Sequence, residues 1–293
     1  SRFCDRRLGL SATPYSIGVV DLWSQLDALE PECWGKSYDF AVRYCDAKPG
    51  EFGGLDTTGV SNEDELKGRL ASIMHVVSRQ EMERSLPGKS RQLVSLRPEQ
   101  LNSAFKGHRG YLKKAIKENG KKGFWEAQIF VAASMKRDWT VTMTAEFMQQ
   151  GRRVVILTGR RGEVERLAAS LATKVGKELR NNIMASHGGH PLTLREEHRQ
   201  RYVNDTTSPL CLIGTHDAWG VAVDGLQSTD VAIMNAIPWT PRILNQSETR
   251  FTRKGQDRRC TIYYPLAEGT VDEEINEHLI QRLDVLADLI EGE

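Results

Sequence analysis

From about residue 125 onward the sequence alternates between short apolar runs and amphipathic stretches, and this alternation restricts the fold more than any other feature. Residues 153–157 are almost wholly apolar, as expected of a strand that is buried on both faces of a parallel sheet. A helical spacing of apolar residues follows at 163–174, and the same order recurs further along the chain. Further strands are expected at 183–186, 210–213, 231–234 and 261–264, and further helices at 125–150, 194–202, 241–253 and 271–289. We therefore predict an α/β domain in which helices cover both faces of a parallel sheet.

The part of the chain before this alternation is organised differently. Residues 7–10 are expected to form a buried strand, 19–29 and 62–84 to form helices, and 91–96 to form a strand that stops before Pro98. A polar, lysine-rich stretch follows, in which Lys113 and Lys114 are neighbours. It is expected to be a solvated linker or a short helical protrusion, and the alternative is a basic surface that contacts DNA phosphates. These patterns divide the chain into residues 1–96, 97–124 and 125–293.

Composition restricts the class of protein without identifying it. The chain has 40 basic and 39 acidic residues, so its net charge of +1 does not by itself indicate a nucleic-acid-binding protein. No apolar run approaches the roughly 20 residues of a membrane span, so no membrane partner is expected. Five cysteines without paired spacing indicate neither a disulfide framework nor a zinc site, and they favour a reducing, intracellular compartment. His187 and His190 flank two glycines, but no third ligand lies at a useful spacing, so we predict a turn there and no metal site.

One segment near the C-terminus indicates chemistry more directly. The chain reads QSETRFTRKGQ from Gln246 onward. If residues 241–253 are helical, Gln246, Arg250 and Arg253 project from one face, because they are four and three positions apart. Two guanidinium forks aimed at one point are suited to binding the phosphate oxygens of a nucleotide and to stabilising the charge that develops during phosphoryl transfer.

The alternative interpretation of this segment is a solvated helix. On it the two arginines would pair with Glu248 or Asp257. In the nucleotide interpretation Glu248 has no role, and we expect its substitution to be nearly silent.

The pattern Q-x-x-x-R-x-x-R-x-G-Q resembles the last motif of superfamily-two helicases, and its Gly-Gln ending is typical of the Swi/Snf-type branch of DNA translocases. Residues 8–14, LGLSATP, resemble the L-S-A-T-P motif of the same superfamily. Residues 40–48, with Ser61-Asn62 and residues 86–89, resemble the annealing helicases of that branch. The resemblance continues to residues 268–272, although the stretch from about 97 to 150 carries little of it.

This resemblance implies a RecA-like P-loop NTPase helicase fold. Residues 1–96 would be the remainder of lobe one, and residues 125–293 a complete lobe two with a parallel sheet. ATP and Mg²⁺ would bind between the lobes, with Arg250 and Arg253 completing the site and Gln246 positioning those arginines or the attacking water. The cofactor-binding residues implied are Gly255, Gln256 and Asp224, although for Asp224 a turn cap is favoured over a ribose contact.

The resemblance also implies contacts to duplex or forked DNA that do not depend on base sequence. Thr215 and Gly220 follow a buried strand, where the family grips the DNA backbone. Ser11 and Thr13 belong to the motif that links the ATP site to the DNA path. The match after Thr215 is partial, because the family has Ala-Gly-Gly-x-Gly where this chain has DAWG.

Two motifs of such a motor are not found in the chain. A glycine-rich phosphate cradle ends in Gly-Lys-Ser/Thr, and a strand-end Asp-Glu pair holds Mg²⁺. The triplets at 35–37 and 88–90 have the right ending, but Glu30 and Glu83 occupy the position that requires a glycine. In the family both motifs lie upstream of L-S-A-T-P. We therefore expect the Mg²⁺ ligands in an upstream RecA-like lobe, carried by the same or another chain.

The sequence thus predicts the C-terminal half of an ATP-dependent DNA translocase or annealing helicase, inactive by itself. It would act in the cytoplasm of a prokaryote or phage-infected cell, or in a nucleus. Two alternatives are a DNA-binding module that does not hydrolyse ATP, and the helicase portion of a restriction or phage-defence complex.

Overall fold

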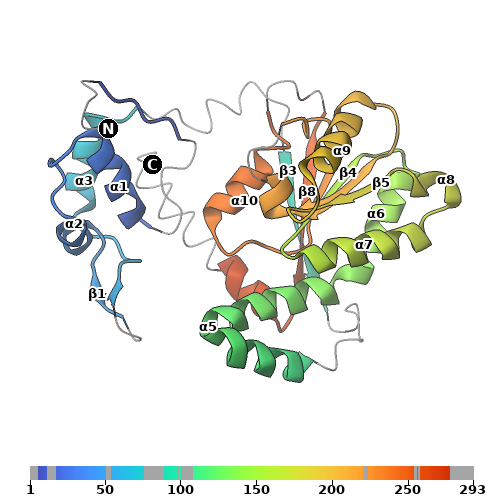
Figure 1. Cartoon of the computed structure of the whole chain (residues 1–293), viewed down its shortest axis with the longest axis horizontal. Helices are drawn as coiled ribbons and strands as arrows, with labels where there is room; N and C mark the ends of the chain where they lie inside the picture. The colour runs from blue at the N-terminus through green and yellow to red at the C-terminus, as the bar shows by residue number, and fades with distance from the viewer. Residues whose placement is uncertain are drawn as a thin grey trace. The chain divides into compact units, whose positions relative to one another are not determined.

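The computed structural model describes residues 6–11, 18–50, 54–75, 89–97, 99, 108–220, 224–253, 256 and 258–277. They fall into two compact units, which we describe separately (Figure 1). Unit 1 consists mainly of residues up to 78, and unit 2 mainly of residues 79–239 and 243–280. None of the helices in these ranges is both long and apolar enough to cross a lipid bilayer.

A small apolar core holds unit 1 together. Its elements are α1 (Val20–Leu29), α2 (Ser37–Tyr44), β1 (Lys48–Pro49), β2 (Leu55–Asp56) and α3 (Glu63–Ala71). Leu22 and Leu26 recur at helical spacing in α1, and Leu66 and Leu70 do so in α3, so each helix buries one face. The helix predicted at 19–29 is confirmed. The helix predicted at 62–84 begins as expected but ends at Ala71, because residues 72–75 are not helical. Its residues from 76 onward lie outside the described ranges.

The strand expected at residues 7–10 is not formed. Leu8 is 84% exposed and Leu10 is 88% exposed. A strand needs a neighbour that pairs with its backbone groups. In the described part of unit 1 the only paired strands are β1 and β2, which are antiparallel to each other.

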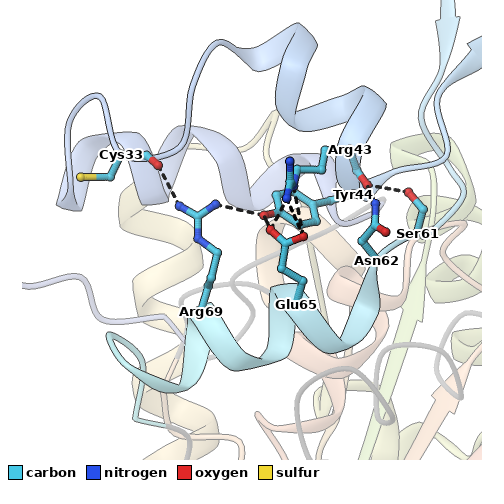
Figure 2. A network of polar contacts seen from close by, with 7 residues as sticks. All are labelled: Cys33, Arg43, Tyr44, Ser61, Asn62, Glu65 and Arg69. Atoms are coloured by element: carbon cyan, nitrogen blue, oxygen red, sulfur yellow. Dashed lines mark hydrogen bonds and ion pairs between the residues drawn. The ribbon is translucent and has the colours of Figure 1, made fainter.

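A polar network joins α2 to α3 in unit 1 (Figure 2). Nε and Nη2 of Arg43 donate to the carboxylate of Glu65, at 3.0 and 2.7 Å. The hydroxyl of Tyr44 donates to the same carboxylate at 2.6 Å and accepts from Arg69 at 3.0 Å. The Arg43 guanidinium, with help from Tyr44, lowers the pKa of Glu65. The residues that carry the resemblance at 40–48 therefore act in part as structural anchors of unit 1.

Unit 2 is built on a six-stranded, wholly parallel sheet in the order β3-β8-β7-β4-β6-β5. The strands are β3 (Lys89–Leu96), β4 (Val154–Thr158), β5 (Ile183–Ser186), β6 (Cys211–Thr215), β7 (Val231–Met234) and β8 (Cys260–Ala267). Every residue of β4, β6 and β7 is buried, as expected for central strands that are covered on both faces.

Helices cover both faces of this sheet (Figure 1). They are α5 (His108–Met135), α6 (Arg137–Gln149), α7 (Arg161–Lys174), α8 (Lys177–Arg180), α9 (Leu192–Asn204), the π-helix η3 (His216–Gly220), α10 (Pro241–Glu248) and a final helical stretch at 271–277. Apolar residues of α6 and α7 pack with one face, which contains Ile156 and Ile233. Residues of α9 and α10 pack with the other face, which contains Leu157 and Met234. The predicted α/β fold with a parallel sheet, as expected for a RecA-like lobe, is therefore confirmed.

Two predictions about the borders of this domain are corrected. The strand at 91–96 was expected in the first part of the chain, but β3 pairs along its whole length with β8 of unit 2. The helix expected at 125–150 is instead two helices, because the helical run breaks at Lys136. The buried side chain of Lys136 forms an ion pair with Asp272 at 2.6 Å and donates to the carbonyl of Pro265 at 2.9 Å.

Candidate nucleotide and nucleic-acid site

The carboxyl ends of the central strands form a pocket of about 350 Å³ in unit 2. The last residue of β4 contributes Thr158, the π-helix after β6 contributes His216, the loop after β7 contributes Trp239, and α5 contributes Phe130. Ligands of open parallel sheets bind at this edge, where loops and helix N-termini converge. The pocket is therefore the natural place for a bound group in unit 2.

Thr158 is a polar member of this pocket that sequence reasoning missed. Its side chain is fully buried, and its Oγ1 atom has no hydrogen-bond partner among the described residues. α7 begins three residues later, at Arg161, so the first amides of that helix point toward the same edge of the sheet. A buried hydroxyl beside a helix N-terminus can bind a phosphate oxygen. The sequence signal was a polar residue ending an apolar strand.

The segment after β6 forms a π-helix, His216–Gly220, rather than an open loop. Thr215 and Gly220, both predicted DNA-binding residues, are buried, whereas Asp217 between them is exposed. Nε2 of His216 lies 2.7 Å from the carbonyl oxygen of Ala236. Burial lowers the pKa of His216, which keeps this imidazole neutral near pH 7.

α10 ends at Glu248, so the helix expected at 241–253 is shorter than predicted. Gln246 lies on α10, whereas Arg250 and Arg253 lie in the turns that follow it. The helix ends there because the chain turns inward to bury Phe251 completely in the core. The backbone N–H of Phe251 donates to the carbonyl of Glu248 at 3.0 Å, as in a tight turn.

The two arginines nevertheless converge on one carboxylate. Nη1 of Arg250 lies 3.7 Å from Oδ1 of Asp224, and Nη1 of Arg253 contacts the same oxygen. Asp224 is mostly exposed, with 71% of its side chain accessible, whereas Arg250 is 11% exposed. Burial lowers the pKa of Arg250 below its ordinary value. Three residues predicted to surround the nucleotide are therefore brought together, although not by a shared helix face.

Gln256 is the other predicted cofactor-binding residue whose place is described. Its side chain is 7% exposed and donates from Nε2 to the carbonyl of Arg258 at 2.6 Å. Its Oε1 atom is buried and has no partner among the described residues. The neighbouring Gly255 lies outside those residues, as does Asp257.

Glu248 is not part of a solvated helix face, and its surroundings do not favour the expectation that its substitution is nearly silent. Its side chain is fully buried, and it accepts from Lys89 at 2.9 Å and from Arg91 at 2.6 Å. The hydroxyl of Tyr264 donates to the same carboxylate at 2.5 Å. The partners of Glu248 are thus on β3 and β8, and the alternative in which Arg250 and Arg253 pair with Glu248 is not what the structure shows.

The remaining predicted DNA-binding residues are far in sequence from the segment that contains Arg250 and Arg253. Ser11 is exposed in unit 1, and Thr13 lies outside the described residues. Lys113 and Lys114 lie on α5, within the stretch expected to be a linker or protrusion. Lys114 is exposed, and the side chain of Lys113 is not among those described.

The two histidines at 187 and 190 meet a third residue that the sequence did not indicate. Nε2 of His187 lies 3.2 Å from Oε1 of Glu165 on α7, and Nε2 of His190 lies 3.6 Å from it. The three potential ligand atoms lie within 4.8 Å of one another. However, Nδ1 of each ring accepts a backbone N–H, from Gly189 and from His187. A neutral ring of this kind carries its hydrogen on Nε2, so Nε2 of His187 donates to Glu165. A metal ion at this position would require the opposite tautomer of both rings.

Comparisons with known proteins give a consistent set of relatives. The chain is 25% identical over 289 residues to SWI/SNF-related matrix-associated actin-dependent regulator of chromatin subfamily A-like protein 1 of Xenopus tropicalis, covering 94% of this chain and 29% of that protein. It is also 25% identical over 283 residues to DNA annealing helicase and endonuclease ZRANB3 of Homo sapiens, covering 91% of this chain and 25% of that protein. The chain thus spans less than a third of the length of these curated relatives.

Structural comparison and family models add little to this. The crystal structure of the C-terminal part of the Fun30 ATPase domain matches with a TM-score of 0.46 and 12% identity, over 66% of this chain and 89% of that one. No family model matches the chain.

Proposed function

Because the chain is related over nearly its whole length to the Swi/Snf-type DNA translocases and annealing helicases, we propose that it is the C-terminal half of an ATP-dependent DNA motor. In this proposal unit 2 is the second RecA-like lobe, and residues up to 78 belong to the first. ATP binds at Arg250 and Arg253 of unit 2. The phosphate cradle and the Mg²⁺ ligands come from an upstream lobe, in the same or another chain.

The observation that carries this proposal is the convergence of Arg250 and Arg253 on Asp224. Two guanidinium groups from different turns reach one carboxylate oxygen, which is the same type of charged acceptor as a phosphate oxygen. We infer that the phosphates of ATP take the place of this carboxylate in the assembled motor. Arg250 is partly desolvated, which strengthens its interaction with a developing negative charge. Gln246 and Gln256 lie on either side of the arginines in sequence and serve to orient them or the attacking water.

DNA binds at the carboxyl edge of the sheet in this proposal. Thr158 and the N-terminus of α7 bind a phosphate of the backbone, and the segment Thr215–Gly220 lies at the end of the neighbouring strand β6. The lysines of α5 extend this surface. Such contacts read the backbone rather than the bases, so binding should not depend on base sequence.

A binding experiment tests the DNA part of the proposal. Fluorescence anisotropy of labelled duplexes of two unrelated sequences should give equal affinities for the chain, and both should weaken steeply as salt is raised. Replacement of Lys113 and Lys114 by alanine should reduce the salt dependence by about one counterion per lysine. Replacement of Lys174 and Lys177, on α7 and α8, serves as the matched control. Absence of binding, or binding to only one sequence, would contradict the proposal.

The alternative of a module that does not hydrolyse ATP makes a separate prediction. Such a module would bind DNA with an affinity that is indifferent to ATP even after an upstream lobe is supplied. The motor proposal requires DNA-stimulated hydrolysis under those conditions.

A further inference from the structure

The buried carboxylate of Glu248 is held by three side chains from two strands, and it lies two residues before Arg250. Lys89 and Arg91 of β3 reach it, and Tyr264 of β8 donates its hydroxyl to it. Glu248 is completely inaccessible, and Lys89 is only 9% exposed. Burial, together with the charge of Glu248, raises the pKa of Tyr264. The hydroxyl therefore stays protonated as a donor.

A buried charge cluster of this kind is a poor way to gain stability. Desolvation of the ions offsets most of their attraction, and apolar residues of the same volume often stabilise a fold as well or better. The cluster instead fixes the orientation of the element that carries Glu248, because an ionic hydrogen-bond network is satisfied in one geometry only. The element that it orients is the end of α10.

The backbone at Glu248 is also where the chain leaves the helix. The carbonyl of Glu248 accepts from the N–H of Phe251 at 3.0 Å and from the hydroxyl of Thr252 at 3.3 Å. Phe251 is fully buried in the core. Arg250 therefore lies between Glu248 and Phe251, which are both held in place, and Arg253 lies two residues after Phe251.

We propose that Glu248 is a positioning residue for the arginine segment, residues 249–253. Lys89, Arg91 and Tyr264 hold its carboxylate, and this fixes the backbone from which Arg250 and Arg253 extend toward the nucleotide. The inference deepens the proposed function and rests on it for the role of the arginines. In this proposal the edge strand β3 has a specific role, because it carries Lys89 and Arg91, the two cations that hold Glu248.

Hydrogen exchange measured by mass spectrometry on the intact chain tests the positioning by itself. Glu248→Gln keeps the shape and the acceptor oxygen but removes the charge. We expect peptides that cover residues 249–253 to exchange at least tenfold faster in this variant, with α7 peptides unchanged. Arg91→Met should produce a smaller change at the same peptides, and because Arg91 is 46% exposed this second variant should fold even if the first does not.

Asp272→Asn is the matched control. Asp272 is equally buried and pairs with the buried Lys136 at 2.6 Å, but it lies on the helical stretch at 271–277 rather than on α10. If it accelerates exchange at residues 249–253 as much as Glu248→Gln does, Glu248 merely stabilises the fold and the proposal is overturned. The same holds if Glu248→Gln accelerates all peptides uniformly.

A second readout separates this inference from the proposed function. In the chain joined to a first RecA-like lobe, Glu248→Gln should lower kcat for ATP more than tenfold while leaving the affinity for DNA within twofold. Faster local exchange with unchanged kcat would keep Glu248 as an anchor but would refute the catalytic role of the segment it anchors.

Discussion

Nδ1 of His216 lies 3.2 Å from Oγ of Ser247, so the π-helix after β6 is hydrogen-bonded to α10. Gly220, at the far end of the same π-helix, also packs against Ser247. One serine thus contacts both ends of the segment proposed to face DNA, and it immediately precedes Glu248. The π-helix is therefore in direct contact with the helix that leads to the arginines.

Gly220→Ala tests how tightly this contact is packed. An added Cβ would overlap Oγ of Ser247 and lie 3.2 Å from its Cβ, so we expect a loss of about 1–3 kcal/mol in the free energy of unfolding. In combination with Ser247→Gly the loss should be smaller than the sum of the two single variants, because the overlap is relieved. Gly162→Ala on α7, where the added Cβ meets nothing within 4 Å, is the control. If the losses in the free energy of unfolding, measured with urea, are strictly additive, the two residues are not in steric conflict in Gly220→Ala.

The pH dependence of stability provides a second test at the same contact. Burial lowers the pKa of His216 below its ordinary value of 6.5 in the folded chain. The unfolded chain therefore binds the proton more readily, so the stabilising contribution of the neutral ring is complete above about pH 6.5 and is lost as the pH falls toward the folded pKa. We expect the wild-type chain to lose more free energy of unfolding between about pH 8 and about pH 5 than His216→Gln does.

Part of the loss will remain in this variant, because burial also lowers the pKa of His187 and of His198. An identical pH profile for the variant and the wild type would refute the role of His216.

Local sequence pattern predicted the central part of unit 2 well. β7 has the predicted bounds and β4 is shifted by one residue, because apolar runs of four or five residues suit strands that are buried on both faces. Pattern failed where a contact joins distant parts of the chain. Glu248 resembled a solvated helix residue, but its partner Arg91 lies 157 residues earlier. The convergence on Asp224 was equally out of reach, since it depends on how two loops meet rather than on helical spacing.

Truncation tests the corrected boundary of unit 2. A fragment that starts at residue 125 lacks β3 and half of α5, so β8 becomes an edge strand and Glu248 is left buried without Lys89 and Arg91. Removing the partners of a buried charge costs about 3–5 kcal/mol. We expect the fragment 89–293 to unfold cooperatively and at a distinctly higher temperature than 125–293, as measured by circular dichroism. Equal melting temperatures of the two fragments would support the boundary at residue 125 that was predicted from the sequence.

Thr158→Val separates DNA binding from stability. Because the Oγ1 atom has no partner among the described residues, its loss should leave the free energy of unfolding unchanged or slightly increased. If that hydroxyl binds a DNA phosphate, affinity for duplex DNA should fall by about 1 kcal/mol, or roughly fivefold. Anisotropy titrations at one fixed salt concentration make the comparison. An unaltered affinity would remove Thr158 from the DNA surface.

The most direct measurement is steady-state ATP hydrolysis with saturating duplex DNA, by the chain alone and by the chain joined to a first RecA-like lobe that carries the phosphate cradle and the Asp-Glu pair. The account predicts no turnover by the chain alone and DNA-stimulated turnover by the joined protein. Arg250→Ala and Arg253→Ala should each lower that turnover by about 10³-fold, Arg→Lys should rescue poorly, and Arg180→Ala on α8 should leave it unchanged. Turnover by the chain alone, or turnover by the joined protein that survives loss of both arginines, would contradict the account.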